Sequence, residues 1–176
     1  MTKRQEFTVL HTYEDFELRE YLPCVIAEVK VSANYSTASS AAFSSLFRYI
    51  SQGNNSSQKI AMTAPVIATQ RAGQPSTDDW YVSFVMPAGS NFADMPDPHD
   101  PRVSLRDLGA QICIASSFRG KATQELSAKK TAQLRAAAVK ENIALSDETR
   151  ICRFDPPVKP GFLQYNEIVI PVYSGK

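Results

Sequence analysis

The sequence predicts an α+β domain, a distorted antiparallel β-barrel or curved sheet of two pseudo-symmetric ββαββ halves with two flanking helices. Three observations support this class. Two segments carry the periodicity of amphipathic helices, several others alternate apolar and polar residues as strands do, and one offset of 87 residues relates these segments in pairs. At 176 residues, the simplest organisation is a single domain over 1–176.

The first part of the chain is predicted to form strands and then a helix. Two short strand signals lie within 8–21, and Cys24–Ser32 alternates as a strand with one buried face does. An amphipathic helix follows over about 36–52. Its apolar residues fall on one side at about 100° per residue: Ala42, Leu46, Tyr49 and Ile50. Gly53 is predicted to end this helix, because glycine accepts the positive φ of a helix C-cap.

Two more strands complete the first half. Pro65 favours extended backbone before it, and strands are predicted at Val66–Gln70 and 80–86. Between them, 71–79 is a turn region rich in Gly, Pro and Asp. Residues 87–101 contain too much Pro and Asp for regular structure, so we expect a loop there.

The second half of the chain repeats the first. Leu18-Arg19-Glu20 is matched 87 residues later by Leu105-Arg106-Asp107. The same offset predicts a strand at 111–119, a helix at 123–139 and a final strand at 167–173. We therefore expect an internal repeat of about 8–87 and 103–173, with antiparallel pairing of strands. A groove where two such halves meet is a common ligand site.

Composition excludes several classes of protein. The net charge of +1 gives no reason to expect a nucleic acid or an anionic membrane as partner. No apolar run approaches the roughly 20 residues that span a bilayer, and the first residues lack the apolar core of a secretory signal. Three widely spaced cysteines without a CxxC pair suit a reducing compartment, so a cytoplasmic location is expected: Cys24, Cys113 and Cys152.

Motifs of enzymes and metal sites are missing. The sequence has no GxSxG elbow, no HExxH and no GxGxxG after a strand, which favours a binding protein over an enzyme. His11 and His99 are too far apart in sequence to indicate a metal site, which needs several converging ligands.

Phe43 and Phe47 widen the apolar side of the first helix. They lie beside its central stripe and extend the apolar arc to nearly 180°, counted at about 100° per residue. A helix that only packs on a sheet needs an arc of about 100°. The extra width covers more of the sheet, or it presents aromatic surface to a flat apolar ligand.

Glu167 opens the last predicted strand. By alternation it shares a face with Val169, Pro171 and Tyr173, and the offset makes Trp80 its counterpart. A carboxylate beside Trp80 and Tyr173 in a groove would attract a cationic or hydrogen-bonding ligand, and burial would raise its pKa. The alternative is an exposed charge at a strand end.

Three stretches of sequence resemble the SOUL heme-binding family: FELREYLPCVIAEV, FRYISQGNNSSQKIAMTAPV and FDPPVKPGFLQYNEIVIPV. The blocks 53–66 and 155–167 match the family in order and spacing. The resemblance implies a distorted β-barrel of two pseudo-symmetric halves with two flanking helices, which binds heme or a related tetrapyrrole without a covalent bond. This fold is similar to that of GyrI-like small-molecule-binding domains.

The resemblance also implies site residues. Phe43 and Phe47 match apolar positions of the heme site, and Arg48 and Lys159 match basic positions near the propionates. Glu167 matches the glutamate with which GyrI-like domains meet cationic ligands. Such a distribution is sensible for heme, because the macrocycle is apolar and its carboxylates favour cations at the rim.

This sequence departs from the family at two positions. Glu20 stands where some members have a histidine proposed as axial ligand, and Ser40 replaces a basic residue of the helix. No histidine here matches a family ligand, so coordination of iron would have to come from a group such as Tyr49 or a cysteine thiolate.

Three functions follow as hypotheses. The first is a carrier or buffer for heme or another tetrapyrrole. The second is binding or hydrolysis of a different hydrophobic or cationic small molecule, with Glu167, Trp80 and Tyr173. The third is a protein interaction in which the first helix docks into a partner groove.

Overall fold

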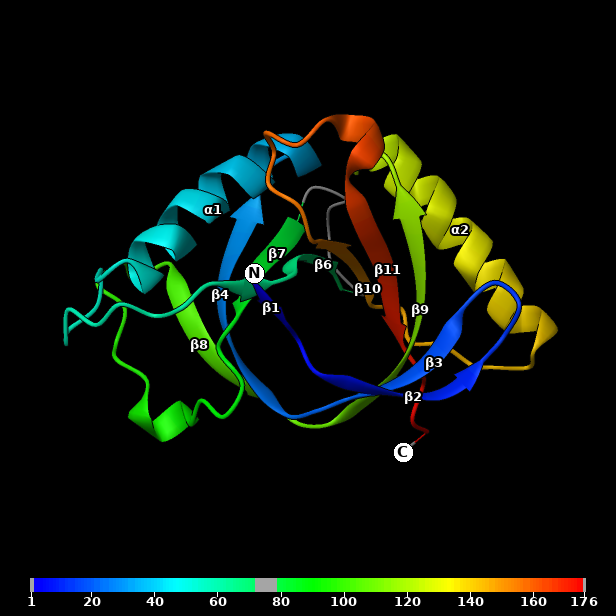
Figure 1. Cartoon of the computed structure of the whole chain (residues 1–176), viewed down its shortest axis with the longest axis horizontal. Helices are drawn as coiled ribbons and strands as arrows, with labels where there is room; N and C mark the ends of the chain where they lie inside the picture. The colour runs from blue at the N-terminus through cyan, green and yellow to red at the C-terminus, as the bar shows by residue number, and fades with distance from the viewer. Residues whose placement is uncertain (1, 72–78, 176) are drawn as a thin grey trace.

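Two helices flank one curled antiparallel sheet in the computed structural model, which describes residues 2–71 and 79–175 (Figure 1). The first strands are β1 (Lys3–Arg4), β2 (Phe7–Thr12), β3 (Glu17–Tyr21), β4 (Cys24–Ser32), β5 (Thr63–Ala64), β6 (Val66–Gln70) and β7 (Asp79–Val85). The later strands are β8 (Val103–Leu108), β9 (Gln111–Arg119), β10 (Thr149–Arg153) and β11 (Tyr165–Pro171). The helices are α1 (Tyr35–Ile50) and α2 (Gln124–Lys140), with 3₁₀ turns η1 (Phe92–Asp94) and η2 (Gly161–Leu163).

The predicted α+β class is confirmed, and the sheet is a curled half-barrel. Among the described residues its nine strands run in the order β2-β3-β9-β11-β10-β6-β7-β4-β8. The edge strands β2 and β8 are at opposite ends of this order, so the barrel does not close. The two-residue strand β1 lies apart from the sheet order and pairs in parallel with β5.

The two halves of the chain exchange their first strands. Strand β3 pairs with β9 of the second half, and β8 of the second half pairs with β4. Tyr21 lies opposite Gln111, and Cys24 lies opposite Leu108. Leu108 is 87 residues after Tyr21 and Gln111 is 87 residues after Cys24, so the predicted offset converts one pairing into the other. Each half therefore completes the sheet of the other. The internal repeat itself stays a prediction.

The offset of 87 does not extend to the last strand. Lys30 lies opposite Tyr81, whereas Ser117, which is 87 residues later, lies opposite Glu167. The counterpart of Glu167 is therefore Tyr81 and not Trp80. Strand β11 also begins and ends two residues before the predicted 167–173.

Helix α1 buries the predicted stripe but ends two residues early. Asn34 caps its first turn by accepting a hydrogen bond from the Thr37 amide, and the four stripe residues are buried. The positive φ after the helix belongs to Gln52, at 82°, and not to Gly53. Gly53 is needed for another reason, because a Cβ atom there would lie 2.5 Å from the Arg48 carbonyl oxygen.

The other predicted helices and strands lie at or near their predicted positions. Strands Cys24–Ser32, Val66–Gln70 and Gln111–Arg119 have the predicted bounds, and α2 is shifted by one residue from 123–139. The predicted loop 87–101 is irregular except for η1. Most of the predicted turn 71–79 lies outside the described residues.

The two faces of the sheet are packed differently. On β11, Ile168 and Ile170 join the core under the helices, and Val169 joins a second cluster on the opposite, inner face. The expected alternation of this strand is thus confirmed, and Glu167 points to the inner face with Val169. Within the described residues, neither helix has the length and apolarity that crossing a bilayer requires.

Candidate functional site

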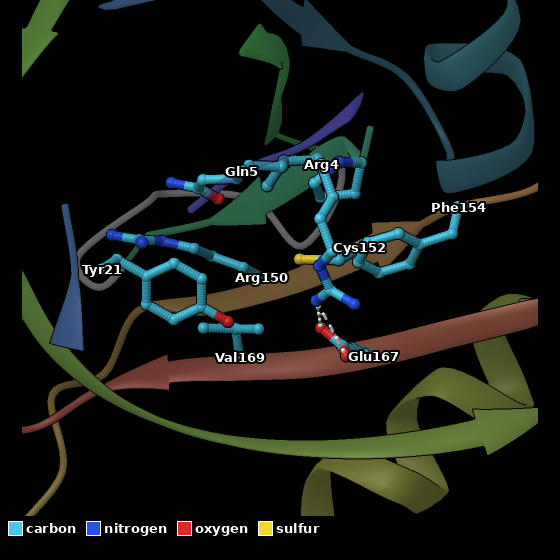
Figure 2. Close-up of a pocket in the computed structure, with 10 residues that line it drawn as sticks. Arg4, Gln5, Tyr21, Arg150, Cys152, Phe154, Glu167 and Val169 are labelled. Atoms are coloured by element: carbon cyan, nitrogen blue, oxygen red, sulfur yellow. Dashed lines mark hydrogen bonds and ion pairs between the residues drawn. The ribbon is translucent and has the colours of Figure 1, made fainter. Parts of the chain in front are cut away.

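Glu167 lies at the centre of a buried polar cluster on the inner face. Its side chain is 1% exposed. Arg19 donates to both carboxylate oxygens, with Nη1–Oε2 and Nη2–Oε1 distances of 2.9 and 3.2 Å. The Tyr165 hydroxyl donates to Oε1 over 2.7 Å. Arg4 Nη2 lies 3.2 Å from both oxygens. Figure 2 marks these contacts between Arg4 and Glu167 with dashed lines. The carboxylate is therefore paired within the chain, which rules out the exposed strand-end charge.

Aromatic rings enclose the arginines that pair with this carboxylate. The guanidinium of Arg4 lies 4.8 Å from the ring centroid of Phe7 and 4.6 Å from that of Phe154. The guanidinium of Arg19 lies 4.1 Å from the ring of Phe7. The space left beside Glu167 is about 10 Å³, which is close to the room that one water needs. Within the part of the chain that the structure describes, the pocket lined by Glu167 is thus too small for an organic ligand, so the geometry does not favour the cationic-ligand alternative.

The expected rise in the pKa of Glu167 is wrong. Burial alone raises the pKa of this carboxyl group, but the hydrogen bonds from Arg19 and Tyr165 and the charges of Arg19 and Arg4 outweigh it. The pKa of Glu167 is lowered from its ordinary value, and the group is a carboxylate at neutral pH.

The structure does not bring Trp80 and Tyr173 to Glu167. Trp80 is buried in the core under the helices, on the other face of the sheet, and its ring centroid lies 5.0 Å from that of Tyr35. Tyr173 lies beyond the end of β11 and is exposed. The expected groove of these three residues is therefore wrong, because the register makes Tyr81 rather than Trp80 the counterpart of Glu167 and β11 ends before Tyr173.

A larger hollow lies along α1, and we call it the apolar hollow. It has a volume of about 290 Å³. Its apolar walls come from α1, from the chain around β5 and β6, and from the segment after β10: Phe43, Met62, Ala64, Val66, Phe154 and Pro157. It lies on the side of α1 where Phe43 widens the apolar arc described above.

The two phenylalanines of α1 remain half exposed. Phe43, 38% exposed, lines the apolar hollow and meets Phe84 edge to face at 5.4 Å. Phe47, 47% exposed, does not line it but stacks on Phe43 with centroids 5.9 Å apart. The central stripe, including Leu46, faces the sheet and is buried, so the exposed large apolar side chains of α1 are Phe43 and Phe47.

The basic residues at the apolar hollow differ from those expected. Arg48 is exposed on α1 and does not line the hollow. Lys159 pairs at 2.9 Å with Asp155, a residue of its lining. Arg153 lines the hollow directly and was missed by sequence reasoning. Its signal was its place beside the aromatic Phe154, two residues before the Asp-Pro-Pro block.

The candidate axial ligands lie elsewhere. His11 packs edge-on against Tyr13 at 4.4 Å, and neither His11 nor His99 lines the apolar hollow. The Tyr49 hydroxyl donates to the Pro96 carbonyl oxygen, and burial raises the pKa of Tyr49 to about 12. Over residues 2–71 and 79–175, no group of three or more His, Cys, Asp or Glu residues is arranged to hold a metal ion.

A family model described as "SOUL heme-binding protein" matches residues 2–171. The chain belongs to the SOUL family. A curated relative, Heme-binding protein 1 of Xenopus laevis, is 29% identical over 147 residues, with 82% of this chain and 77% of that protein covered. Heme-binding protein 1 of Xenopus tropicalis is 27% identical, with the same coverage.

Solved structures share the fold of this SOUL protein. The C-terminal domain of EcmrR has a TM-score of 0.68 and 11% identity, over 90% of this chain and 96% of that one. A hydrolase of Listeria innocua has a TM-score of 0.63 and 11% identity, over 98% and 93%. At such identities the likeness concerns the fold alone, and it confirms the GyrI-like arrangement expected for a SOUL chain.

Proposed function

We propose that this protein binds heme or a related tetrapyrrole non-covalently in the apolar hollow along α1, as a carrier or buffer. One observation carries the proposal: a SOUL chain presents an aromatic-walled hollow with an arginine in its lining. Its relatives in Xenopus are named Heme-binding protein 1. At Glu167 the carboxylate is already paired with Arg4 and Arg19, so it offers no anchor for a cationic ligand.

The walls of the apolar hollow fit a flat apolar ring. Phe43 of α1 and Phe154 of the segment after β10 supply aromatic surface, and Pro157 adds a rigid apolar contact. Apolar area removed from water stabilises such a complex by roughly 25 cal/mol per Å². A volume of about 290 Å³ is at the small end of ligand pockets, so one part of a macrocycle stays in solvent. Partial cover favours exchange of the ligand, as a carrier requires.

The donor set fits a ligand held by packing and charge. As far as the described residues go, the lining of the apolar hollow contains the thioether of Met62 but no imidazole, thiol or phenol. A bound heme would supply a redox-active iron, and Met62 is the lining residue able to meet it as a weak ligand. The protein's own residues then act by surrounding the ring and by opposing its charge.

The test is a titration with hemin that follows the Soret band. We expect a saturable shift with one equivalent, and Phe43→Ala should weaken affinity about tenfold, the loss expected for roughly 1.4 kcal/mol of aromatic contact. Phe92→Ala is the matched control, because Phe92 is similarly exposed but lies in η1, away from the hollow. A non-saturable titration, or equal affinities for both variants, would contradict the proposal.

The proposal includes a reducing, cytoplasmic setting. Cys24, Cys113 and Cys152 are free thiols. Burial raises the pKa of Cys113 to about 11 and also raises that of Cys152, so both thiols stay protonated and unreactive at neutral pH. Fractionation of native cells should recover the protein with cytoplasmic markers, and its recovery from a secreted fraction would contradict this setting.

A further inference from the structure

A second, more polar hollow adjoins the apolar hollow. It has a volume of about 690 Å³, and we call it the polar hollow. Its walls come from the starts of α1 and α2 and from the segment between β10 and β11, which Figure 1 shows crossing between the two helices. Four residues line both hollows, so a single ligand can extend from one into the other: Ser39, Arg153, Asp155 and Pro157.

The polar hollow carries unmatched positive charge. Neither Arg153 nor Lys121 forms an ion pair with a carboxylate in the part of the chain that the structure describes. Asp155 is the acidic residue of the lining, and its charge is matched by Lys159 at 2.9 Å. Asp155 also accepts the amide hydrogen of Tyr165 at 2.7 Å. The net charge of this lining is therefore positive.

The guanidinium of Arg153 is held in place at the boundary of the two hollows. Its Nε donates to the Tyr35 hydroxyl and its Nη2 to Ser39 Oγ, both over 3.1 Å. Its carbon lies 4.7 Å from the ring centroid of Tyr35, which is itself buried. These contacts fix the orientation of the group while Nη1 has no partner among the described residues. A fixed guanidinium with a free N–H edge is well suited to a carboxylate.

We infer that Arg153, assisted by Lys121, receives the carboxylates of the ligand in the polar hollow while its apolar ring lies in the apolar hollow. This inference rests on the proposed function and specifies the ligand class as a flat apolar ring with carboxylates along one edge. It replaces Arg48 and Lys159 as the expected partners, since Arg48 lies outside both hollows and Lys159 is paired.

The test compares iron protoporphyrin IX with its dimethyl ester, titrated in the same detergent and followed by the Soret band. The intact protein should bind the dicarboxylate about tenfold more tightly, the effect of one charge-assisted hydrogen bond. Arg153→Met should remove most of that preference by weakening only the dicarboxylate, and Arg153→Lys should restore part of it. Lys140→Met, at the far end of α2, is the control and should retain the full preference.

Each outcome has a separate meaning. Saturable binding of both porphyrins with equal affinity, unchanged in Arg153→Met, would overturn the inference and leave the proposed function standing. Absence of saturable binding for either porphyrin would overturn the proposed function and the inference with it. Because Arg153 also contacts Tyr35 and Ser39, thermal melts of both Arg153 variants show whether a loss of affinity follows from unfolding.

Discussion

Glu167 shows how one buried charge shapes the inner face. An ionised carboxylate with no contact to water is costly unless several donors surround it, and here two arginines and one tyrosine do so. The two arginines come from the beginning of the chain and from β3, and the tyrosine from β11 itself, so the cluster ties the first residues to the last strand. The cluster contributes to stability rather than to binding, because these donors already occupy both carboxylate oxygens and leave neither available to a ligand.

The first prediction concerns Glu167→Gln. The pKa of Glu167 is lowered in the folded state, so its ionisation stabilises the fold at pH values above its unfolded pKa, which is near the ordinary value of 4.5. This stabilisation is lost as the pH falls through the pKa of the folded state. We expect the variant to lose about 3 kcal/mol of unfolding free energy at pH 7, because Arg19 is left buried without its main partner. Urea titrations from pH 7 to pH 3 measure this difference.

The difference between wild type and Glu167→Gln should therefore shrink as the pH falls below 4.5. Glu141→Gln, an exposed substitution after α2, is the control and should match wild type at every pH. A loss of stability independent of pH would show that packing, rather than ionisation, accounts for the role of Glu167.

The second prediction separates the two arginines of the cluster. The side chain of Arg19 is 7% exposed and that of Arg4 is 41% exposed. Arg19→Met should cost about 3 kcal/mol, as for a buried pair, whereas Arg4→Met should cost about 1 kcal/mol or less because water screens that pair. Urea unfolding at pH 7 measures both, and equal losses would contradict the ranking by burial.

At the residue scale the sequence predicted which way a side chain points better than it predicted which residues that side chain contacts. Alternation placed Glu167 correctly with Val169, because that pattern is a local property of a strand. It did not show that Arg4, more than 160 residues away in sequence, pairs with this carboxylate. Arg153 was missed for the same reason, since its partners Tyr35 and Ser39 come from α1.

Helix α1 positions the candidate site through both of its ends. Its start lines the polar hollow, and its end is fixed by a close turn in which the Gly53 amide donates to the Arg48 carbonyl oxygen over 2.8 Å. Asn54, fully buried, then holds the following loop by donating to the carbonyl oxygens of Tyr49 and Gln58. This turn directs the chain from α1 towards Met62, a wall of the apolar hollow.

The third prediction concerns Gly53→Ala. The added Cβ atom would lie 2.5 Å from the Arg48 carbonyl oxygen, so the backbone of the turn must shift. We expect a loss of about 2 kcal/mol, within the range of strained or overpacked substitutions. Gly109→Ala is the matched control, because nothing lies within 4 Å of its Cβ position. Equal urea midpoints for the two variants would show that the turn adapts freely.

At the element scale the sequence predicted helices and strands well, and their ends less well. The buried stripe of α1 was confirmed because residues three and four apart in sequence lie on the same face of a helix, so the sequence itself shows the pattern. The end of α1 and the bounds of β11 were off by two residues, since turns such as that at Gly53 depend on contacts that no local pattern shows.

The whole molecule is held together by the exchange of strands between its halves. Without the second half, β3 loses its partner β9 and β4 loses its partner β8. An unpaired strand edge exposes backbone donors and acceptors and favours association over folding. The two halves should therefore unfold as one cooperative unit.

The fourth prediction is that neither half folds alone. Fragments 1–101 and 102–176, produced separately, should show no cooperative thermal transition by circular dichroism. Mixing them should restore a sigmoidal melt and the native emission of Trp80, which is buried against Tyr35 in the intact fold. A sigmoidal melt from either fragment by itself would show that the halves are independent.

At this scale the sequence predicted the fold class and the family, and not the pairing. An offset of 87 residues identifies segments that are alike, but it does not say whether each strand pairs within its own copy or with the other. The sequence left a curved sheet and a distorted barrel as alternatives, and the choice of an open half-barrel depends on the positions of the edge strands β2 and β8, which is also a long-range property.

The position of Thr2 has a practical consequence for work with this protein. Thr2 lines the apolar hollow, and the next residues are anchored beside it by pairing with β5. A fluorescent dye attached ahead of Thr2 would therefore report arrival of a coloured macrocycle by energy transfer. A bulky purification tag at the same point would obstruct the opening, whereas one placed after Tyr173 would lie outside both hollows.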